Sequence, residues 1–241
     1  MSEVDISIII PAYNEESRIG KSLLSALEYL QKFGLTFEII VVDDGSTDNT
    51  AQVSGSIDKC VRVLVQPANT GKGAAVRRGM LEACGKIRLF SDADFSTPVY
   101  ELPKIVGALN DGYDICIGSR ALRPELIKKH QPFYREFMGK TFNKIIQIVL
   151  FKGIKDTQCG FKGFTDSAAM KLFSDAKIDG FGFDVEILFL ARKNGLRIKE
   201  EPVEWYNDKR STVSPIADSL KMIGEIFRIK RLHKRNTKTK S

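Results

Sequence analysis

The sequence predicts an α/β fold with a mostly parallel central sheet that is flanked by helices. Short apolar runs at 6–10 and 37–42 contain no alternating polar residues, which is typical of strands buried on both faces. The segment 16–33 lies between them and carries Ile19, Leu23, Leu24, Leu27 and Leu30 at helical spacing. Strands then alternate with helical segments of about 10–15 residues, which is the pattern of βαβ units.

The expected elements of the first half follow one another without a break. They are strand 6–10, helix 16–33, strand 37–42, helix 47–57, strand 61–65, helix 72–83, strand 87–90, helix 98–110 and strand 113–117. The second half begins with a loop over 119–133. It continues with helices over 134–151, 166–173, 184–194 and 215–232, and with a strand over 196–203. Because no repeat or linker is evident, we expect one domain over 1–232 with halves 1–118 and 119–232, then a basic tail at 233–241.

The charge distribution and the cysteines narrow the class of protein. The net charge of +7 resides in residues 221–241, which hold eight Lys or Arg and one Glu. Such a segment suits an anionic membrane, nucleic acid or a solvated terminus.

The four cysteines form no C-x-x-C pair and only two histidines exist, so a zinc site is excluded and reduced intracellular thiols are expected. We expect no signal peptide and no membrane span, because the apolar run 145–151 is far shorter than the ~20 residues needed.

Acidic and hydroxyl side chains follow the expected strands at the point where each strand ends. Residues 11–16, 43–48, 92–94 and 118–120 follow the first, second, fourth and fifth strands. Ligands of open α/β sheets bind at this carboxyl edge. In the segment 43–48, one carboxylate is expected to accept a hydrogen bond from a base or ribose hydroxyl. The alternative is a glycine turn at Gly45 followed by a helix cap.

Asp92 and Asp94 are the strongest candidates for a metal site. They follow the apolar strand 87–90, and residues two apart in an extended chain point the same way. Two carboxylates at this edge can hold Mg²⁺ or Mn²⁺ on a substrate diphosphate, where the ion neutralises the charge of a leaving nucleoside diphosphate. The alternative is a solvated turn whose aspartate caps the helix that follows.

Two further segments suggest phosphate binding. The segment 69–73, Asn-Thr-Gly-Lys-Gly, opens a helix but matches neither a P-loop nor a dinucleotide fingerprint, so Lys72 is expected to meet either a phosphate or an acid. Arg120 and Arg135 lie in a basic stretch that can bind phosphates or form a solvated face. A nucleophilic triad is not supported, because His130 and His233 are the only histidines.

The ordered motifs resemble the family 2 inverting glycosyltransferases of the GT-A fold. The motifs that carry the resemblance are Pro11-Ala-Tyr-Asn-Glu15, Val42-Asp-Asp-Gly-Ser-Thr47, Asn69-x-Gly-Lys-Gly73, Asp92-Ala-Asp94 and Gly118-Ser-Arg120. The later segments 156–162, 183–186 and 202–205 are similar to the dolichyl-phosphate (polyprenyl-phosphate) β-glucosyltransferase branch, which is related to the dolichyl-phosphate mannose synthases. The resemblance covers about residues 5–232. It implies a nucleotide-sugar-binding half at 1–118 and an acceptor-side half at 119–232.

The resemblance also implies a site, residue by residue. The nucleoside would be held by Pro11, Tyr13, Glu15, Val42 and Asp44. The diphosphate side would be formed by Lys72, Asp92 and Ala93, with Arg120 and Arg135 near phosphates. The metal would be held by Asp92, Asp94 and Ser96, where Ser96 replaces the Gln of the mannose synthases. The sugar and acceptor side would be lined by Asp156, Gln158, Asp184 and Glu186, with Arg210 as a late basic residue. The implied catalytic residues are Asp94, Arg120 and Asp184.

The implied activity is metal-dependent, inverting transfer of a hexose, glucose from UDP-glucose, to a polyprenyl or dolichyl phosphate. A phosphate acceptor is already an anion, so it needs little general-base help, and catalysis would rest on positioning and charge stabilisation. The alternatives are another donor such as GDP-mannose, a non-lipid glycan or small-molecule acceptor, and a non-catalytic nucleotide-sugar-binding protein. A sugar nucleotidyltransferase is disfavoured, because it would need a glycine-rich basic loop where 11–16 offers acids.

A membrane is the remaining expected partner, and nucleic acid is not expected. The apolar face of 137–151 and the basic tail could dock the chain on an anionic bilayer. The alternative is that the segment 137–151 packs in the core. We therefore expect a cytoplasmic protein that can also associate peripherally with the cytoplasmic face of a membrane.

Overall fold

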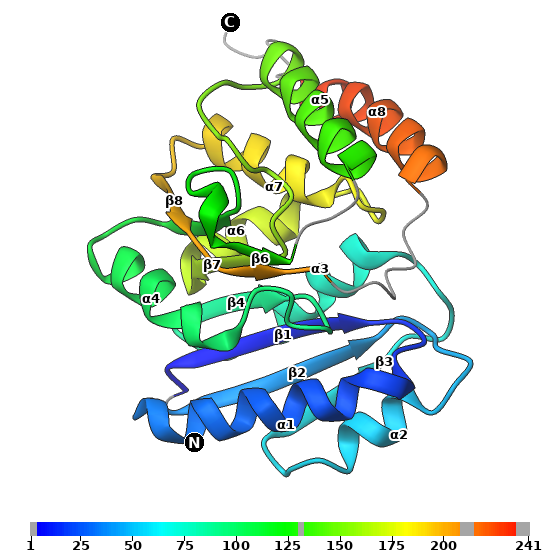
Figure 1. Cartoon of the computed structure of the whole chain (residues 1–241), viewed down its shortest axis with the longest axis vertical. Helices are drawn as coiled ribbons and strands as arrows, with labels where there is room; N and C mark the ends of the chain where they lie inside the picture. Colours follow the sequence, from blue (N-terminus) through cyan, green and yellow to red (C-terminus); the bar gives the residue numbers. More distant parts are fainter. Residues whose placement is uncertain (1–3, 130–132, 208–214, 235–241) are drawn as a thin grey trace, which may run out of the picture.

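The structure is a computed structural model that describes residues 4–129, 133–207 and 215–234, and its centre is a seven-stranded sheet (Figure 1). The strands, in spatial order, are β3 (Val61–Val65), β2 (Phe37–Asp43), β1 (Ile6–Ala12), β4 (Ile87–Ser91), β7 (Phe161–Thr165), β5 (Ile115–Ser119) and β8 (Ile198–Pro202). Within these described residues, β7 is antiparallel to both of its neighbours and every other pairing in the sheet is parallel. The predicted α/β class with a mostly parallel sheet is confirmed.

Helices cover both faces of the sheet. One face carries α1 (Glu16–Phe33), α2 (Thr50–Gly55) and α4 (Leu102–Asn110); the other carries α3 (Lys72–Glu82), α6 (Asp166–Asp175) and α7 (Phe183–Lys193). Two short 3₁₀ turns are η1 (Val99–Glu101) and η2 (Pro124–Leu126). Successive residues of β1 serve opposite layers, since Ile8 and Ile10 pack toward α1 and Ile9 packs toward α3. This two-sided burial explains the continuous apolar runs of the sequence.

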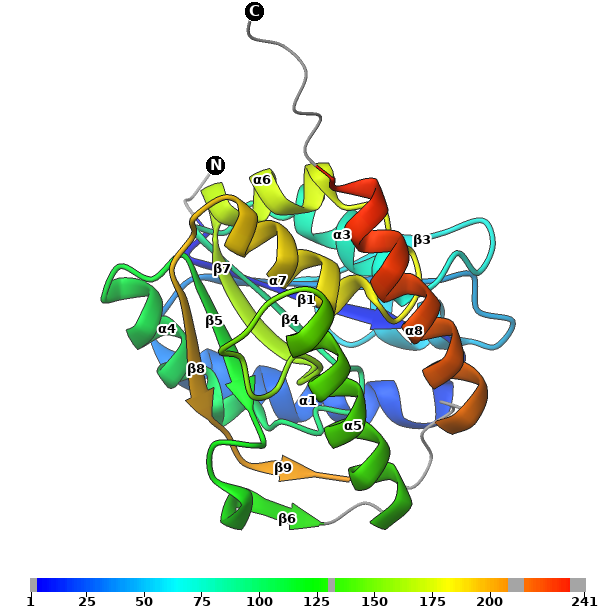
Figure 2. The ribbon, with the colours of Figure 1, turned by 90° about the horizontal axis from the view of Figure 1, so that it is seen from above.

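A helix pair, α5 (Phe133–Val149) and α8 (Pro215–Leu232), lies side by side beyond one end of α7 (Figures 1 and 2). Its seam buries Phe142, Ile146, Met222, Ile226 and Ile229. The apolar face of 137–151 therefore packs against α8 at Phe142 and Ile146, as the core alternative predicted. Among the described residues, none of the helices combines the length and apolarity needed to cross a bilayer.

The strand β7 and a second, two-stranded sheet were not predicted. That small sheet pairs β6 (Ile127–Lys129) with β9 (Trp205–Tyr206) in parallel. The sequence of β7, Phe-Lys-Gly-Phe-Thr, hides its strand character because it contains a lysine. Lys162 is nevertheless fully buried, since a carboxylate from another element, Asp184, compensates its charge.

Candidate active site

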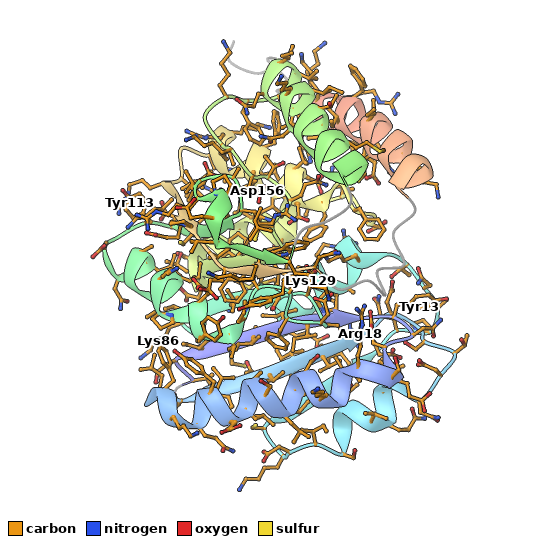
Figure 3. The ribbon with its side chains drawn as sticks, viewed as in Figure 1. Tyr13, Arg18, Lys86, Tyr113, Lys129 and Asp156 are labelled. Atoms are coloured by element: carbon orange, nitrogen blue, oxygen red, sulfur yellow. The ribbon has the colours of Figure 1, made fainter. Side chains whose placement is uncertain are left out.

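The predicted polar segments meet at the carboxyl edge of the sheet. Figure 3 shows Tyr13 and Arg18 at this end of β1, while Lys86 and Tyr113 lie at the opposite edge. Because β7 is antiparallel, its amino end reaches the same edge and brings residues 156–160 beside the end of β4. The amide of Asp92 donates to the carbonyl of Gly160 at 3.2 Å. A Cβ on Gly160 would lie 1.9 Å from Asp92 Oδ2, so only glycine permits this approach.

Each acid of the Asp92/Asp94 pair has a basic partner, and the two partners come from opposite faces of the sheet. Lys72, the first residue of α3, places Nζ 2.5 Å from Asp92 Oδ1. Arg18, in the first turns of α1, places Nη1 3.4 Å from Asp94 Oδ2. The same guanidinium is held by Glu15 through Nε and Nη2. Lys72 thus meets an acid, which was one of the two expected partners.

Burial changes the protonation equilibria at this edge. Burial raises the pKa of Asp94, and the neighbouring Asp92 raises it further, against the opposing effects of the Ser96 amide and of Arg18. Burial alone would lower the pKa of Lys72, but the carboxylates of Asp92 and Asp184 raise it above its usual value. Lys72 therefore stays charged, and the acid pair concentrates negative charge in a partly dehydrated place.

Arg120 and Asp156 form a second ion pair at this edge. Asp156 accepts from Arg120 Nε at 2.7 Å, from Nη2 at 2.9 Å and from the backbone amide at 3.0 Å. Although burial opposes the charge of Asp156, Arg120 lowers its pKa to about 2. The guanidinium also lies 5.4 Å from the ring centroid of Trp205. Glu200 accepts from the Lys155 and Asp156 amides, which fixes the loop before β7.

Asp184 is buried near Asp92 and is not exposed at the edge of the sheet. Lys162 Nζ is 2.5 Å from Asp184 Oδ1 and also donates to the carbonyl of Cys159. Burial raises the pKa of Asp184, while Lys162 and Lys72 oppose that effect. Only one member of this pair was predicted, since Asp184 was a candidate site residue. Lys162 was missed because a buried lysine gives no hydrophobic signal in the sequence.

Glu186, expected to line the acceptor side, is fully buried instead. Its carboxylate accepts from the amides of Lys177 and Ile178 and lies 2.6 Å from His233 Nε2. It therefore ties the end of α8 to the loop before α7, because an uncompensated buried carboxylate would be costly. His233, expected in the basic tail, packs as part of the fold.

The carboxylate of Asp44, a predicted nucleoside ligand, holds the loop before α3. It accepts from the Thr70 and Gly71 amides at 2.9 and 2.8 Å and from Gln66 Nε2 at 2.5 Å. Gly71 has φ +107 and packs against the Asp179 carbonyl, so glycine is needed here for the fold itself. The Asp179 carbonyl also accepts from the first amides of α3, which makes that helix end a contact with the protein.

The other predicted residues occupy varied environments. Pro11 is the penultimate residue of β1, Tyr13 is exposed at its end, and Val42 and Ala93 are buried, so these last two can reach a ligand mainly through backbone atoms. The backbone amide of Gln158 donates to Asp156 Oδ1. Arg135 lies on α5 with its side chain outside the described residues, and Arg210 is wholly outside them. Arg18, which the sequence analysis missed, stands one turn into a helix, where an arginine normally signals only a solvated face.

The residues present fit a divalent cation whose remaining ligands come from its substrate. Within 4–129, 133–207 and 215–234, no group of three or more His, Cys, Asp or Glu side chains could enclose a metal ion. Asp92 and Asp94 remain as two carboxylates at one turn, and Ser96 is anchored there through its amide, which donates to Asp94 Oδ1 at 2.9 Å. Magnesium-type sites use one or two carboxylates together with substrate phosphates.

Comparisons with known proteins identify relatives of this chain. The glycosyl transferase family 2 model matches residues 7–173. The dolichyl-phosphate beta-glucosyltransferases of Saccharomyces cerevisiae and Homo sapiens are 36% and 37% identical over 250 and 236 residues. These alignments cover 95% and 90% of this chain, and 75% and 72% of the relatives.

Solved structures extend the likeness to the fold. A mannosyl-3-phosphoglycerate synthase from Rubrobacter xylanophilus superposes with a TM-score of 0.75 at 20% identity, covering 99% of this chain and 77% of that one. A glucosyl-3-phosphoglycerate synthase from Mycobacterium tuberculosis, solved with Mn²⁺, UDP and glucosyl-3-phosphoglycerate, gives 0.66 at 21% identity, covering 94% and 80%.

Fold and site together define a GT-A enzyme with an acidic pair at the carboxyl edge of its sheet. The chain belongs to glycosyl transferase family 2, so it is a glycosyltransferase, as the motif order predicted.

Proposed function

We propose that the chain transfers glucose from UDP-glucose to a polyprenyl or dolichyl phosphate, with inversion and with a divalent cation. The observation that carries the proposal is the Asp92/Asp94 turn. Lys72 pairs with Asp92 and Arg18 with Asp94, and Arg120 lies near enough for the charge of Asp92 to act on it. The names of the curated relatives support the acceptor, and the Mn²⁺ and UDP of the solved neighbour support the donor and the ion.

On the donor side, Asp92 and Asp94 would hold Mg²⁺ or Mn²⁺, with the hydroxyl of Ser96 as a weaker ligand. The ion would supply charge neutralisation for the leaving nucleoside diphosphate. Lys72 stands within reach of the same place and carries the charge needed to contact a phosphate oxygen. Tyr13, exposed beside the end of β1, and the backbone of Val42 would contact the nucleoside.

On the acceptor side, no hydrogen bond engages Nη1 of Arg120 within the described part of the chain, so this nitrogen is available to a phosphate. Asp156 engages Nε and Nη2 of Arg120, which fixes the plane of the side chain. We assign Nη1 to the lipid phosphate, whose oxygen attacks the anomeric carbon as the bond to the diphosphate breaks. Since this nucleophile is anionic, positioning by Arg120 takes the place of a general base.

Transfer of labelled hexose into a lipid-extractable product tests the proposal. The reaction contains polyprenyl phosphate, Mg²⁺ or Mn²⁺ and each of UDP-glucose and GDP-mannose, with Asp94→Asn as the site variant. We expect product from UDP-glucose only, dependent on metal and reduced at least about 100-fold in the variant. Metal-independent transfer, or label from GDP-mannose alone, would contradict it.

A second acceptor class is suggested by the solved neighbours, whose names specify phosphoglycerate. Both acceptors present a phosphate, so the same assay includes 3-phosphoglycerate as a competitor. Label in a water-soluble product with no lipid product would replace the lipid acceptor and keep the donor assignment.

We also propose that the α5/α8 pair contacts an anionic membrane at the cytoplasmic face. Phe227 on α8 is 58% exposed and Ile148 on α5 is 82% exposed. Exposed basic residues accompany them on α8 and just after it, at Lys221, Arg228, Lys230, Arg231 and Lys234. Apolar side chains beside basic ones suit the boundary between headgroups and acyl chains.

Flotation with liposomes tests this contact. We expect binding to vesicles containing phosphatidylserine at low salt, and at least about fivefold weaker binding after Phe227→Glu, because burying a new charge at the bilayer is unfavourable. Leu24→Glu is the matched control, since Leu24 is 56% exposed on the distant helix α1. Absence of wild-type binding, or equal loss in both variants, would refute the contact.

A further inference from the structure

The chain Glu15–Arg18–Asp94 joins the turn after β1 to the acidic pair after β4. The Arg18 guanidinium spans the two acids: two nitrogens contact Glu15 and the third lies 3.4 Å from Asp94 Oδ2. All three side chains are largely buried, with Arg18 only 11% exposed. Because Glu15 holds two of its nitrogens, the Arg18 guanidinium stays at this edge, which distinguishes it from a solvated surface charge.

A matching contact exists on the other acid. Lys72 Nζ lies 2.5 Å from Asp92 Oδ1 and 5.9 Å from the centroid of the Phe183 ring, so its charge stands beside this acid. Three acids and two bases meet here when Glu15 is included, so Arg18 and Lys72 compensate two of the three negative charges. A divalent cation approaching Asp92 and Asp94 therefore meets two positive charges at contact distance from its own ligands, and like charges at this range weaken binding.

Binding of a nucleoside diphosphate would remove this repulsion of the cation. Its oxygens offer new anionic partners to a guanidinium and an ammonium, which are the common phosphate-binding groups of proteins. Once the bases turn toward the diphosphate, both carboxylates are free for the cation. Since binding free energies are reciprocal, the same exchange makes the cation strengthen nucleotide binding.

We propose that Arg18 makes divalent-cation binding conditional on the donor diphosphate. It neutralises Asp94 while the site is empty and contacts the diphosphate when the donor is bound, so the cation enters with the nucleotide. This role rests on the proposed function, because it assumes a nucleoside diphosphate at this edge.

Titration of Mn²⁺ with the full chain, followed by the electron paramagnetic resonance signal of free Mn²⁺, measures this coupling without turnover. The arms are Mn²⁺ alone, Mn²⁺ with UDP and Mn²⁺ with GDP. For the wild type we expect weak binding of Mn²⁺ alone and at least about tenfold tighter binding with one nucleotide, a usual size for coupling between sites.

The Arg18→Gln variant should bind Mn²⁺ alone about 5- to 30-fold more tightly than the wild type, since one positive charge beside Asp94 is gone. The factor by which nucleotide tightens Mn²⁺ binding should be smaller in this variant than in the wild type. Arg18→Lys keeps the charge and should restore much of the wild-type difference. Arg62→Gln is the matched control, because Arg62 also bridges two carboxylates, Glu38 and Glu82, but lies at the other end of β3.

The outcomes separate the two proposals. If Arg18→Gln binds Mn²⁺ alone within twofold of the wild type while UDP still tightens the wild type, the role of Arg18 is wrong and the proposed function stands. If Mn²⁺ affinity falls in the variant together with its melting temperature, Arg18 is only structural and the inference is overturned. If neither nucleotide promotes Mn²⁺ binding to the wild type, both proposals fail.

Discussion

Replacing Gly160 by alanine tests the arrangement of the site with one methyl group. The added Cβ would lie 1.9 Å from Asp92 Oδ2 and 2.4 Å from its Cγ, whereas carbon and oxygen atoms in ordinary contact are about 3.4 Å apart. The carboxylate must therefore move by more than about 1 Å. That movement also breaks the 2.5 Å contact with Lys72.

The expected cost falls on activity more than on stability. A displacement of about 1 Å at a reacting centre costs roughly 100-fold in rate, which corresponds to about 3 kcal/mol at the transition state. The free energy of unfolding should fall by only about 1 kcal/mol, at the low end for overpacking, because the Asp92 side chain is partly exposed and can rotate.

The assay combines lipid-linked product formation with thermal unfolding. We expect Gly160→Ala to lose about 10- to 100-fold in kcat/KM, in the range of losses when metal-site supports are changed, while its melting temperature falls by a few degrees. Gly107→Ala on α4 is the control, since nothing lies within 4 Å of its added Cβ and alanine favours a helix. Full activity in Gly160→Ala would show that the position of Asp92 does not matter and would refute the reasoning.

Three further predictions concern the ion pairs and thiols. Asp156→Asn should destabilise the chain at pH 7. Because the folded pKa of Asp156 lies at about 2, below 3.8, the roughly 2 kcal/mol tied to its ionisation is present above pH 4 and disappears as the pH falls toward 2, so urea unfolding of wild type and variant should converge in acid. Lys162→Met or Asp184→Asn alone should each cost about 3–5 kcal/mol in urea unfolding, while the double variant recovers part of the loss; additive losses would contradict a coupled buried pair. Burial raises the pKa of the Cys116 thiol to about 12, so at pH 8 a thiol reagent should modify the exposed Cys84 well before Cys116 in the folded chain, and equal rates would contradict that burial.

Much of the site was predictable because its residues follow strands. Apolar runs define β1, β2 and β4, and parallel strands bring their carboxyl ends to one edge, so Asp92 and Asp94 could be placed there from the sequence, whereas the partner of Lys72 stayed open. Local order along the chain thus determined the fold class, the acidic edge and the family.

Contacts between distant residues decided the rest. Arg18 and Asp94 are 76 positions apart, and neither segment contains a signal for the other. The antiparallel entry of β7, which sets Gly160 against Asp92, depends on burying Lys162 beside Asp184, a compensation that appears only once α7 is packed.

The acidic residues show both what the sequence determines and what only the tertiary structure decides. The sequence by itself determined that this chain is an α/β enzyme of glycosyl transferase family 2 with an acidic pair after its fourth predicted strand. Only the tertiary structure decided that Asp44 and Glu186 hold loops and that Asp92 and Asp94 each carry a base. The physical reason is that a carboxylate's partners are set by burial and by neighbours from other elements, which no local pattern records.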